Sequence, residues 1–169
     1  RKAVMLDWKP PKVMMYGEKL TEEHLCAILS PFHSTNATIE AMETGIFEYD
    51  PPLGSILPAC ESQLLRVAFT PPPESSQNYT TAFKTVTVQV RKMQPSIFWK
   101  PKKYNLNDGE PLTKLQLNAL AVFRQSIIKG TYTYNPPIDT VLPCGRHTLE
   151  VKFTATDQVN SHNAMGTTA

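Results

Sequence analysis

Residues 47–58 read FEYDPPLGSILP, and residues 132–143 read YTYNPPIDTVLP. Five of the twelve aligned positions are identical and five more are conservative exchanges, at a constant spacing of 85 residues. Two adjacent prolines end a strand, because each one removes a ladder donor and pushes the residue before it out of the helical region. The same proline-rich phrase written twice therefore predicts a corner that belongs to a repeated fold.

The repetition extends over most of the chain. The matching segments are W-K-P at 8–10 and 99–101, G-E at 17–18 and 109–110, and LLRVAFT at 64–70 with TLEVKFT at 148–154. Self-similarity at a nearly fixed spacing indicates tandem structural units. We therefore divide the chain into repeat 1 (1–90) and repeat 2 (91–169), and the near absence of a linker between them predicts a stiff, end-to-end arrangement.

Most segments have the alternation of a strand with one buried face. In LLRVAFT, Leu65, Val67 and Phe69 alternate with polar or small residues, and KTVTVQV (84–90) alternates valine with threonine or glutamine. This period of two, with β-branched and aromatic residues, is typical of half-buried strands. We expect about seven short strands per repeat and an all-β fold of two tandem immunoglobulin-like β-sandwich domains.

Two details of this fold can be predicted separately. KLTEEHLCAIL (19–29) and PLTKLQLNALAVF (111–123) come closest to a helical pattern, but each is expected to be a strand preceded by a turn. Repeat 2 ends in SHNAMGTTA (161–169), where we find no counterpart of KTVTVQV. The sequence thus predicts that the second domain lacks its last strand, which would belong to a longer array beyond residue 169.

Taken together, the motifs W-K-P, G-x-F-x-Y-x-P-P-x-G-S-I-L-P, L-x-V-x-F-T-P and N-Y-T-T resemble the tandem bacterial Ig-like repeats of large surface proteins. The resemblance covers both repeats and implies modules that serve as spacers and binding platforms. The chain departs from that family in its six methionines, three cysteines and four histidines. It also departs in residues 91–169, where ten Lys/Arg against five Asp/Glu give a net charge of +5. These departures favour a diverged, eukaryotic and intracellular user of the module.

The sequence contains no motif for catalysis or for a cofactor. It has no G-x-S-x-G, no P-loop and no G-x-G-x-x-G, and its four histidines are scattered. Cys26, Cys60 and Cys144 have no C-x-x-C spacing, and we expect them to pack as small hydrophobic residues. No apolar run approaches the roughly 20 residues that cross a bilayer. We therefore expect a non-enzymatic protein with no cofactor, no bound metal and no membrane insertion.

The stretch RKMQPSIFWKPKKY (91–104) is the candidate patch for partner contact. It holds five cations, namely Arg91, Lys92, Lys100, Lys102 and Lys103. Such a stretch can be a solvated strand edge, can contact an acidic protein surface, or can bind nucleic acid through its interleaved aromatic residues. Trp99 has a counterpart in Trp8, whose surroundings are less basic, so packing explains the ring better than nucleic-acid binding does.

The sequence therefore predicts a structural and protein-interaction module, a segment of a larger scaffold in a cytoskeletal or ciliary assembly. Its partners would be other proteins, including neighbouring repeats of the same chain, contacted through sheet edges and the loop around 30–44. The alternative is an extracellular adhesin stalk, which a glycan on Asn36 or Asn78 would support. A carbohydrate- or ligand-binding sandwich would need clustered aromatic residues on a concave face, whereas here most of the aromatic residues fall on positions predicted to be inward.

Overall fold

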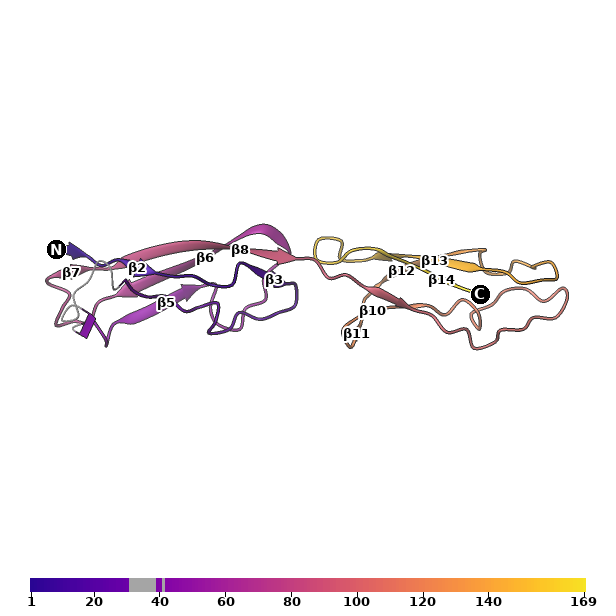
Figure 1. The fold of residues 1–169 in the computed structure, drawn as a ribbon, viewed down its shortest axis with the longest axis horizontal. Helices are drawn as coiled ribbons and strands as arrows, with labels where there is room; N and C mark the ends of the chain where they lie inside the picture. Colours follow the sequence, from indigo (N-terminus) through magenta and orange to yellow (C-terminus); the bar gives the residue numbers. More distant parts are fainter. Residues whose placement is uncertain (31–38, 41) are drawn as a thin grey trace. The chain divides into compact units, whose positions relative to one another are not determined.

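A computed structural model of the chain describes residues 1–30, 39–40 and 42–169 and has an all-β fold (Figure 1). The chain forms two compact units, Arg1–Arg91 and Lys92–Ala169, for which we keep the names repeat 1 and repeat 2. The alternation of apolar and polar residues does produce strands, so the expectation of an all-β protein is confirmed.

Repeat 1 is built around one four-stranded sheet. The strands of repeat 1 are β1 (Lys2–Ala3), β2 (Leu6–Asp7), β3 (Val13–Met15), β4 (Ile28–Leu29), β5 (Ile46–Asp50), β6 (Cys60–Thr70), β7 (Tyr79–Thr80) and β8 (Ala82–Arg91). The sheet has the order β3-β8-β6-β5, while β2 pairs with β4 and β1 with β7. The inward residues Leu65, Val67 and Phe69 of β6 pack in one core with Trp8 and Val88, as their alternation predicts.

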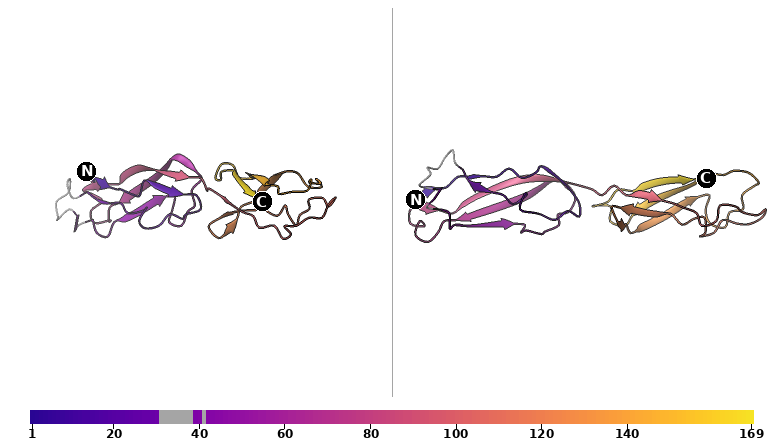
Figure 2. Two further views of the ribbon diagram at one scale, coloured as in Figure 1. Left: turned by 45° about the vertical axis from the view of Figure 1, so that its right-hand side comes forward. Right: turned by 60° about the horizontal axis from the view of Figure 1, so that its bottom comes forward.

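Repeat 2 consists of two three-stranded sheets. Its strands are β9 (Ser96–Phe98), β10 (Leu120–Phe123), β11 (Ser126–Ile127), β12 (Gly130–Asn135), β13 (Leu149–Ala155) and β14 (Ala164–Thr168). The sheets have the orders β11-β10-β9 and β12-β13-β14. Ile97 and Ala121 of the first sheet pack against Phe153 and Ala164 of the second, so the two sheets face each other as a sandwich. Figure 2 shows the yellow β14 beside the orange β13.

The prediction that repeat 2 lacks its last strand is wrong for the first half of that strand, which β14 forms, whereas residues 88–91 of β8 have no counterpart within residues 92–169. β14 pairs antiparallel with β13 and places Ala164 opposite Phe153, just as β8 places Ala82 opposite Phe69. The sequence pattern does not predict this strand, because AMGTT has no alternating valines. Its counterpart is AFKTV (82–86), the first half of β8. The hydrogen-bonding edge of β13 fixes this strand in place although its own side chains have weak strand character.

The segments 19–29 and 111–123 do consist of a turn followed by a strand, but the strands are short. The N–H of Leu25 donates to the carbonyl oxygen of Thr21 at 3.1 Å, and the N–H of Leu117 donates to that of Thr113 at 3.0 Å. Only β4 and β10 follow as strands. Each of these hydrogen bonds spans four residues and closes one α-turn, a single helical turn that does not continue. This explains the short helix-like pattern in the sequence.

Candidate interaction surfaces

The corner formed by FEYDPPLGSILP is held by the backbone of Leu20. Its N–H donates to the carbonyl oxygen of Ser55 at 2.9 Å, and its carbonyl oxygen accepts from the N–H of Gly54 at 2.8 Å. Leu112 makes the same pair of bonds to the corresponding corner of repeat 2, each 2.9 Å long. The repeated phrase is therefore part of the scaffold, and the contact surfaces have to be sought elsewhere.

A tryptophan and a tyrosine pack together at one end of each repeat, and we call this pair the Trp–Tyr clamp. In repeat 1, the rings of Trp8 and Tyr49 meet edge to face with centroids 5.5 Å apart. Trp8 Nε1–H donates to the carbonyl oxygen of His24 at 2.9 Å, and the Tyr49 hydroxyl accepts from the N–H of Ala27 at 3.0 Å. Burial raises the pKa of the Tyr49 hydroxyl.

Repeat 2 has the same clamp. The rings of Trp99 and Tyr134 have centroids 5.5 Å apart, and Trp99 Nε1–H donates to the carbonyl oxygen of Gln116 at 2.8 Å. Burial also raises the pKa of the Tyr134 hydroxyl. Trp99 is thus a packing residue like its counterpart in repeat 1, and its indole N–H already has a partner.

The five cations of the stretch 91–104 lie in different settings. Arg91 ends β8 and belongs to repeat 1, whereas the other four belong to repeat 2. Arg91, Lys100 and Lys102 are exposed. Lys92 donates from Nζ to the carbonyl oxygen of Gln158 at 2.6 Å. Lys100 and Lys102 are thus the cations of repeat 2 in this stretch whose side chains are open to solvent.

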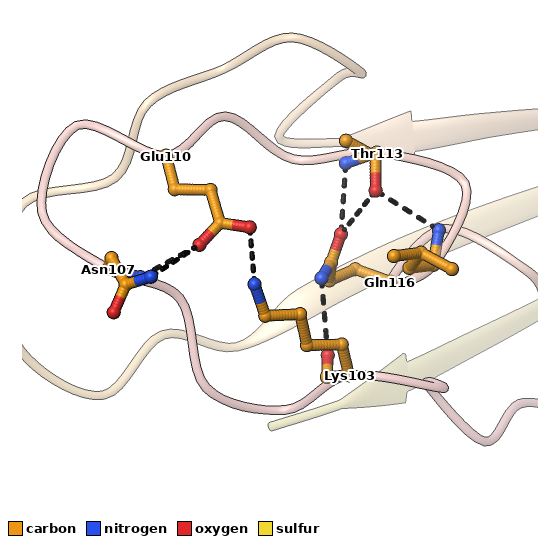
Figure 3. Close-up of polar contacts among 6 residues, drawn as sticks. Lys103, Asn107, Glu110, Thr113 and Gln116 are labelled. Carbon is orange, nitrogen blue, oxygen red and sulfur yellow. Dashed lines mark hydrogen bonds and ion pairs between the residues drawn. The ribbon is translucent and has the colours of Figure 1, made fainter.

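Lys103 pairs with Glu110 and helps to fix a turn (Figure 3). The second carboxylate oxygen of Glu110 accepts from the backbone N–H of Asn107 at 3.0 Å. The hydrogen bond from Lys103, and then the one from Asn107, hold the pKa of Glu110 below its ordinary value. Lys103 is therefore engaged within its own repeat, in a role that the sequence pattern did not reveal.

Gln116 is a buried polar residue that the sequence reasoning missed. Its Oε1 accepts from both the N–H and the hydroxyl of Thr113 at 3.0 Å, and its Nε2 donates to the carbonyl oxygen of Lys103 at 3.3 Å (Figure 3). In repeat 1 the N–H of Thr21 donates to the His24 ring at 3.2 Å. A threonine three residues before a polar side chain is the signal that could have identified this turn.

Each repeat has a large, exposed apolar side chain on the outward face of one sheet: the four-stranded sheet in repeat 1 and the β12-β13-β14 sheet in repeat 2. Phe83 of β8 is 76% exposed, and Met165 at the matching position of β14 is 77% exposed. A hollow of about 500 Å³ lies over the sheet of repeat 1, and its outward-facing lining residues are Glu48, Asp50, Arg66, Ala68, Phe83 and Thr85. The alternation of β8 is a sequence signal for this exposed residue, because it places position 83 on the outward face.

The edge strands are β3 and β5 in the four-stranded sheet of repeat 1, and β9, β11, β12 and β14 in the two sheets of repeat 2. The loop around 30–44, the other surface predicted for partner contact, falls largely on residues 31–38 and 41, which lie outside the described residues. Asn36 lies there as well. Asn78 is described and exposed at a turn just before β7, whereas Tyr79 and Thr80 of its sequon are half-buried in that strand.

The expectation that the cysteines pack as small hydrophobic residues is wrong. Cys26, Cys60 and Cys144 are all exposed free thiols. Apolar neighbours cover the inward positions of the strands, so a cysteine in a loop or on an outward position stays in water. Across residues 1–30, 39–40 and 42–169, we find no group of three His, Cys, Asp or Glu side chains placed to hold a metal ion.

No family model matches the chain, and neither a curated protein nor a solved structure matches it. The resemblance to bacterial Ig-like repeats therefore stays a prediction from sequence motifs. Within the part of the chain that the structure describes, no helix is long and apolar enough to cross a membrane.

Proposed function

We propose that the two repeats are immunoglobulin-like modules of a structural and protein-interaction segment within a larger scaffold protein, with no catalytic role. The observation that carries the proposal is the pair of exposed apolar side chains, Phe83 and Met165, at the same outward position of both sheets. A large apolar group surrounded by polar and charged side chains has the composition of a protein contact site, with an apolar centre and a polar rim.

The two copies differ where they face solvent and agree where they face the core, which supports separate contacts on a common scaffold. Around Phe83 lie the carboxylates of Glu48 and Asp50 and the guanidinium of Arg66. Met165 instead lies opposite Lys152 on the neighbouring strand. Because complementary charge sets partner choice at such surfaces, we propose different protein partners for the two repeats, and an acidic partner surface for the more basic repeat 2.

A photo-crosslinking experiment tests this function. A photoreactive amino acid is placed at position 83 of the full chain expressed in its native cells, and a control chain carries it at Gln77, an exposed turn residue of the same repeat. We expect discrete protein adducts at position 83 and none of them at position 77. Equal adduct patterns from the two positions would refute a contact site centred on Phe83.

A substitution provides the second arm. Phe83→Ser should abolish the adducts formed from a crosslinker at the neighbouring Thr85, while the free energy of unfolding changes by less than about 0.5 kcal/mol, as is usual at exposed positions. A loss of adducts accompanied by unfolding would instead mean that Phe83 acts through stability.

The alternative function is an extracellular adhesin stalk, and the exposed side chain of Asn78 in its sequon favours it. A glycan on Asn78 in native material would support the stalk and exclude the cytoskeletal or ciliary scaffold that we prefer. Reduced thiols at the three exposed cysteines of native material would support the scaffold, because an oxidising compartment converts such thiols.

A further inference from the structure

Repeat 2 has an open groove at the end where its corner lies. The groove has a volume of about 490 Å³ and is lined by residues 104–107, by residues 142–147 and by Thr168 and Ala169. Its apolar lining comes from Leu106, Leu112, Leu142 and Leu149.

In repeat 1 the second half of β8 fills the corresponding space. Val88 and Val90 are 2% and 3% exposed there and belong to the core. This half of β8 runs parallel to β3, with Val90 beside Met14, and antiparallel to the start of β6, with Val90 opposite Cys60. One strand therefore joins two others and covers the apolar residues beneath it.

The segments that flank the groove in repeat 2 match those two strands. The N–H of Asn107 donates to the Glu110 carboxylate at 3.0 Å, as the N–H of Met15 donates to that of Glu18 at 2.8 Å, so residues 105–107 correspond to β3. Residues 144–148 precede β13 and correspond to the start of β6. In the described chain neither segment is a strand.

The apolar side chains on the floor of the groove are more exposed than their counterparts in repeat 1. Leu57 and Met14 are buried in repeat 1. Their counterparts Leu142 and Leu106 are only half-buried in repeat 2. The groove thus combines two rows of backbone hydrogen-bonding groups with an apolar floor, which are the two features that an added strand requires.

We propose that this groove is an acceptor site for a β-strand that continues β14, with an apolar side chain at the first and third positions after Ala169. Register supports this occupant: Thr168 lies opposite Leu149 as Val86 lies opposite Leu65, so the first position after Ala169 corresponds to Val88. The strand runs parallel to residues 105–107 and antiparallel to residues 144–148. The inference is independent of the proposed function.

The test compares three forms of the protein by amide hydrogen exchange. The first is the 169-residue chain, the second carries Val-Gln-Val-Arg after Ala169 in the order of residues 88–91, and the third carries Asp-Gln-Asp-Arg as the matched control. We expect the valine extension to slow exchange over residues 104–107 and 144–148 by about tenfold or more, because new strand pairing protects those amides. Exchange in β6 should be equal in all three forms and reports that repeat 1 is folded.

Equal exchange from the two extended forms would overturn the proposal. A fourth sample adds the free peptide Thr-Val-Gln-Val-Arg, the sequence of residues 87–91, to the unextended chain. Protection by this peptide without protection by the valine extension would mean that the groove binds a strand of another chain, which also overturns a continuation of β14. Protection by the extension supports it, whether or not the free peptide binds.

Discussion

The Tyr134 hydroxyl accepts a hydrogen bond of 3.0 Å from the backbone N–H of Ala119, and in repeat 1 the Tyr49 hydroxyl accepts one of 3.0 Å from Ala27. Each bond satisfies a backbone donor next to the first strand after the turn. The tyrosine ring meanwhile packs against the tryptophan of its own repeat, so one residue joins the corner to the opposite sheet.

Removing only the hydroxyl should reveal the contribution of this bond. We expect Tyr134→Phe to lower the free energy of unfolding by about 1 kcal/mol, because the ring contacts remain while the Ala119 N–H loses its acceptor. Urea denaturation measures the change. Tyr104→Phe is the control, since Tyr104 is 61% exposed, and it should change the free energy by less than about 0.5 kcal/mol. Equal effects of the two substitutions would contradict the role of Tyr134.

Gly45 lies against the ring of Phe69 so closely that a Cβ atom would be 2.3 Å from it. We expect Gly45→Ala to destabilise repeat 1 by about 1–3 kcal/mol, as overpacking of a core commonly does. Thermal unfolding measures the loss. Because the clash is with one ring, adding Phe69→Leu should cost less in the Gly45→Ala background than in the wild type. Additive effects of the two substitutions would show that the ring is not the cause.

Much of the fold could be predicted from local sequence. Pro51 and Pro52 remove ladder donors, so the corner follows from their chemistry alone. The alternation in β6 and β13 likewise determines which side chains face the core, and Phe69 and Phe153 are both fully buried. In these segments each residue's own preference agrees with the packing around it.

The rest depended on neighbours that are distant in sequence. β14 contains Gly166 and two threonines and is a strand because β13 offers it an edge. The engagement of Lys103 could not be predicted either, because its partner Glu110 is placed by a turn and charge alone does not distinguish a paired lysine from a free one. The outward Phe83 was visible in the sequence, but only the structure shows the charged residues around it.

The corner of repeat 1 contains Gly54 at a φ of +83°, where repeat 2 has Asp139 at a φ of +66°. A Cβ atom at Gly54 would meet no atom within 4 Å, so backbone conformation decides most of the cost of a substitution. We expect Gly54→Asp to cost less than about 1 kcal/mol and Gly54→Val about 1–2 kcal/mol, since the left-handed region disfavours β-branched residues. Denaturant unfolding of both variants tests the order, and an equal cost would contradict it.

The carboxylate of Glu110 has a lowered pKa because Lys103 and the Asn107 N–H both donate to its charged form. A carboxylate whose pKa is lower in the folded than in the unfolded chain stabilises the fold above the unfolded pKa, which is about 4.3 for glutamate. This stabilisation is lost as the pH falls through the lower, folded pKa. The ion pair should therefore contribute at neutral pH and disappear in acid.

Glu110→Gln should accordingly lower the unfolding midpoint at pH 7 and make the variant and the wild type converge as the pH falls below about 4, because protonation removes the same charge from the wild type. Urea midpoints measured at a series of pH values from neutral to acid give the comparison. Asp108→Asn, in the same exposed turn, is the matched control and should leave the urea midpoint at pH 7 close to that of the wild type, because Asp108 lies outside the Lys103–Glu110 ion pair. A gap between Glu110→Gln and the wild type that stays constant with pH would show that the side chain stabilises the turn by its shape and neutral hydrogen bonds, and that its charge contributes nothing.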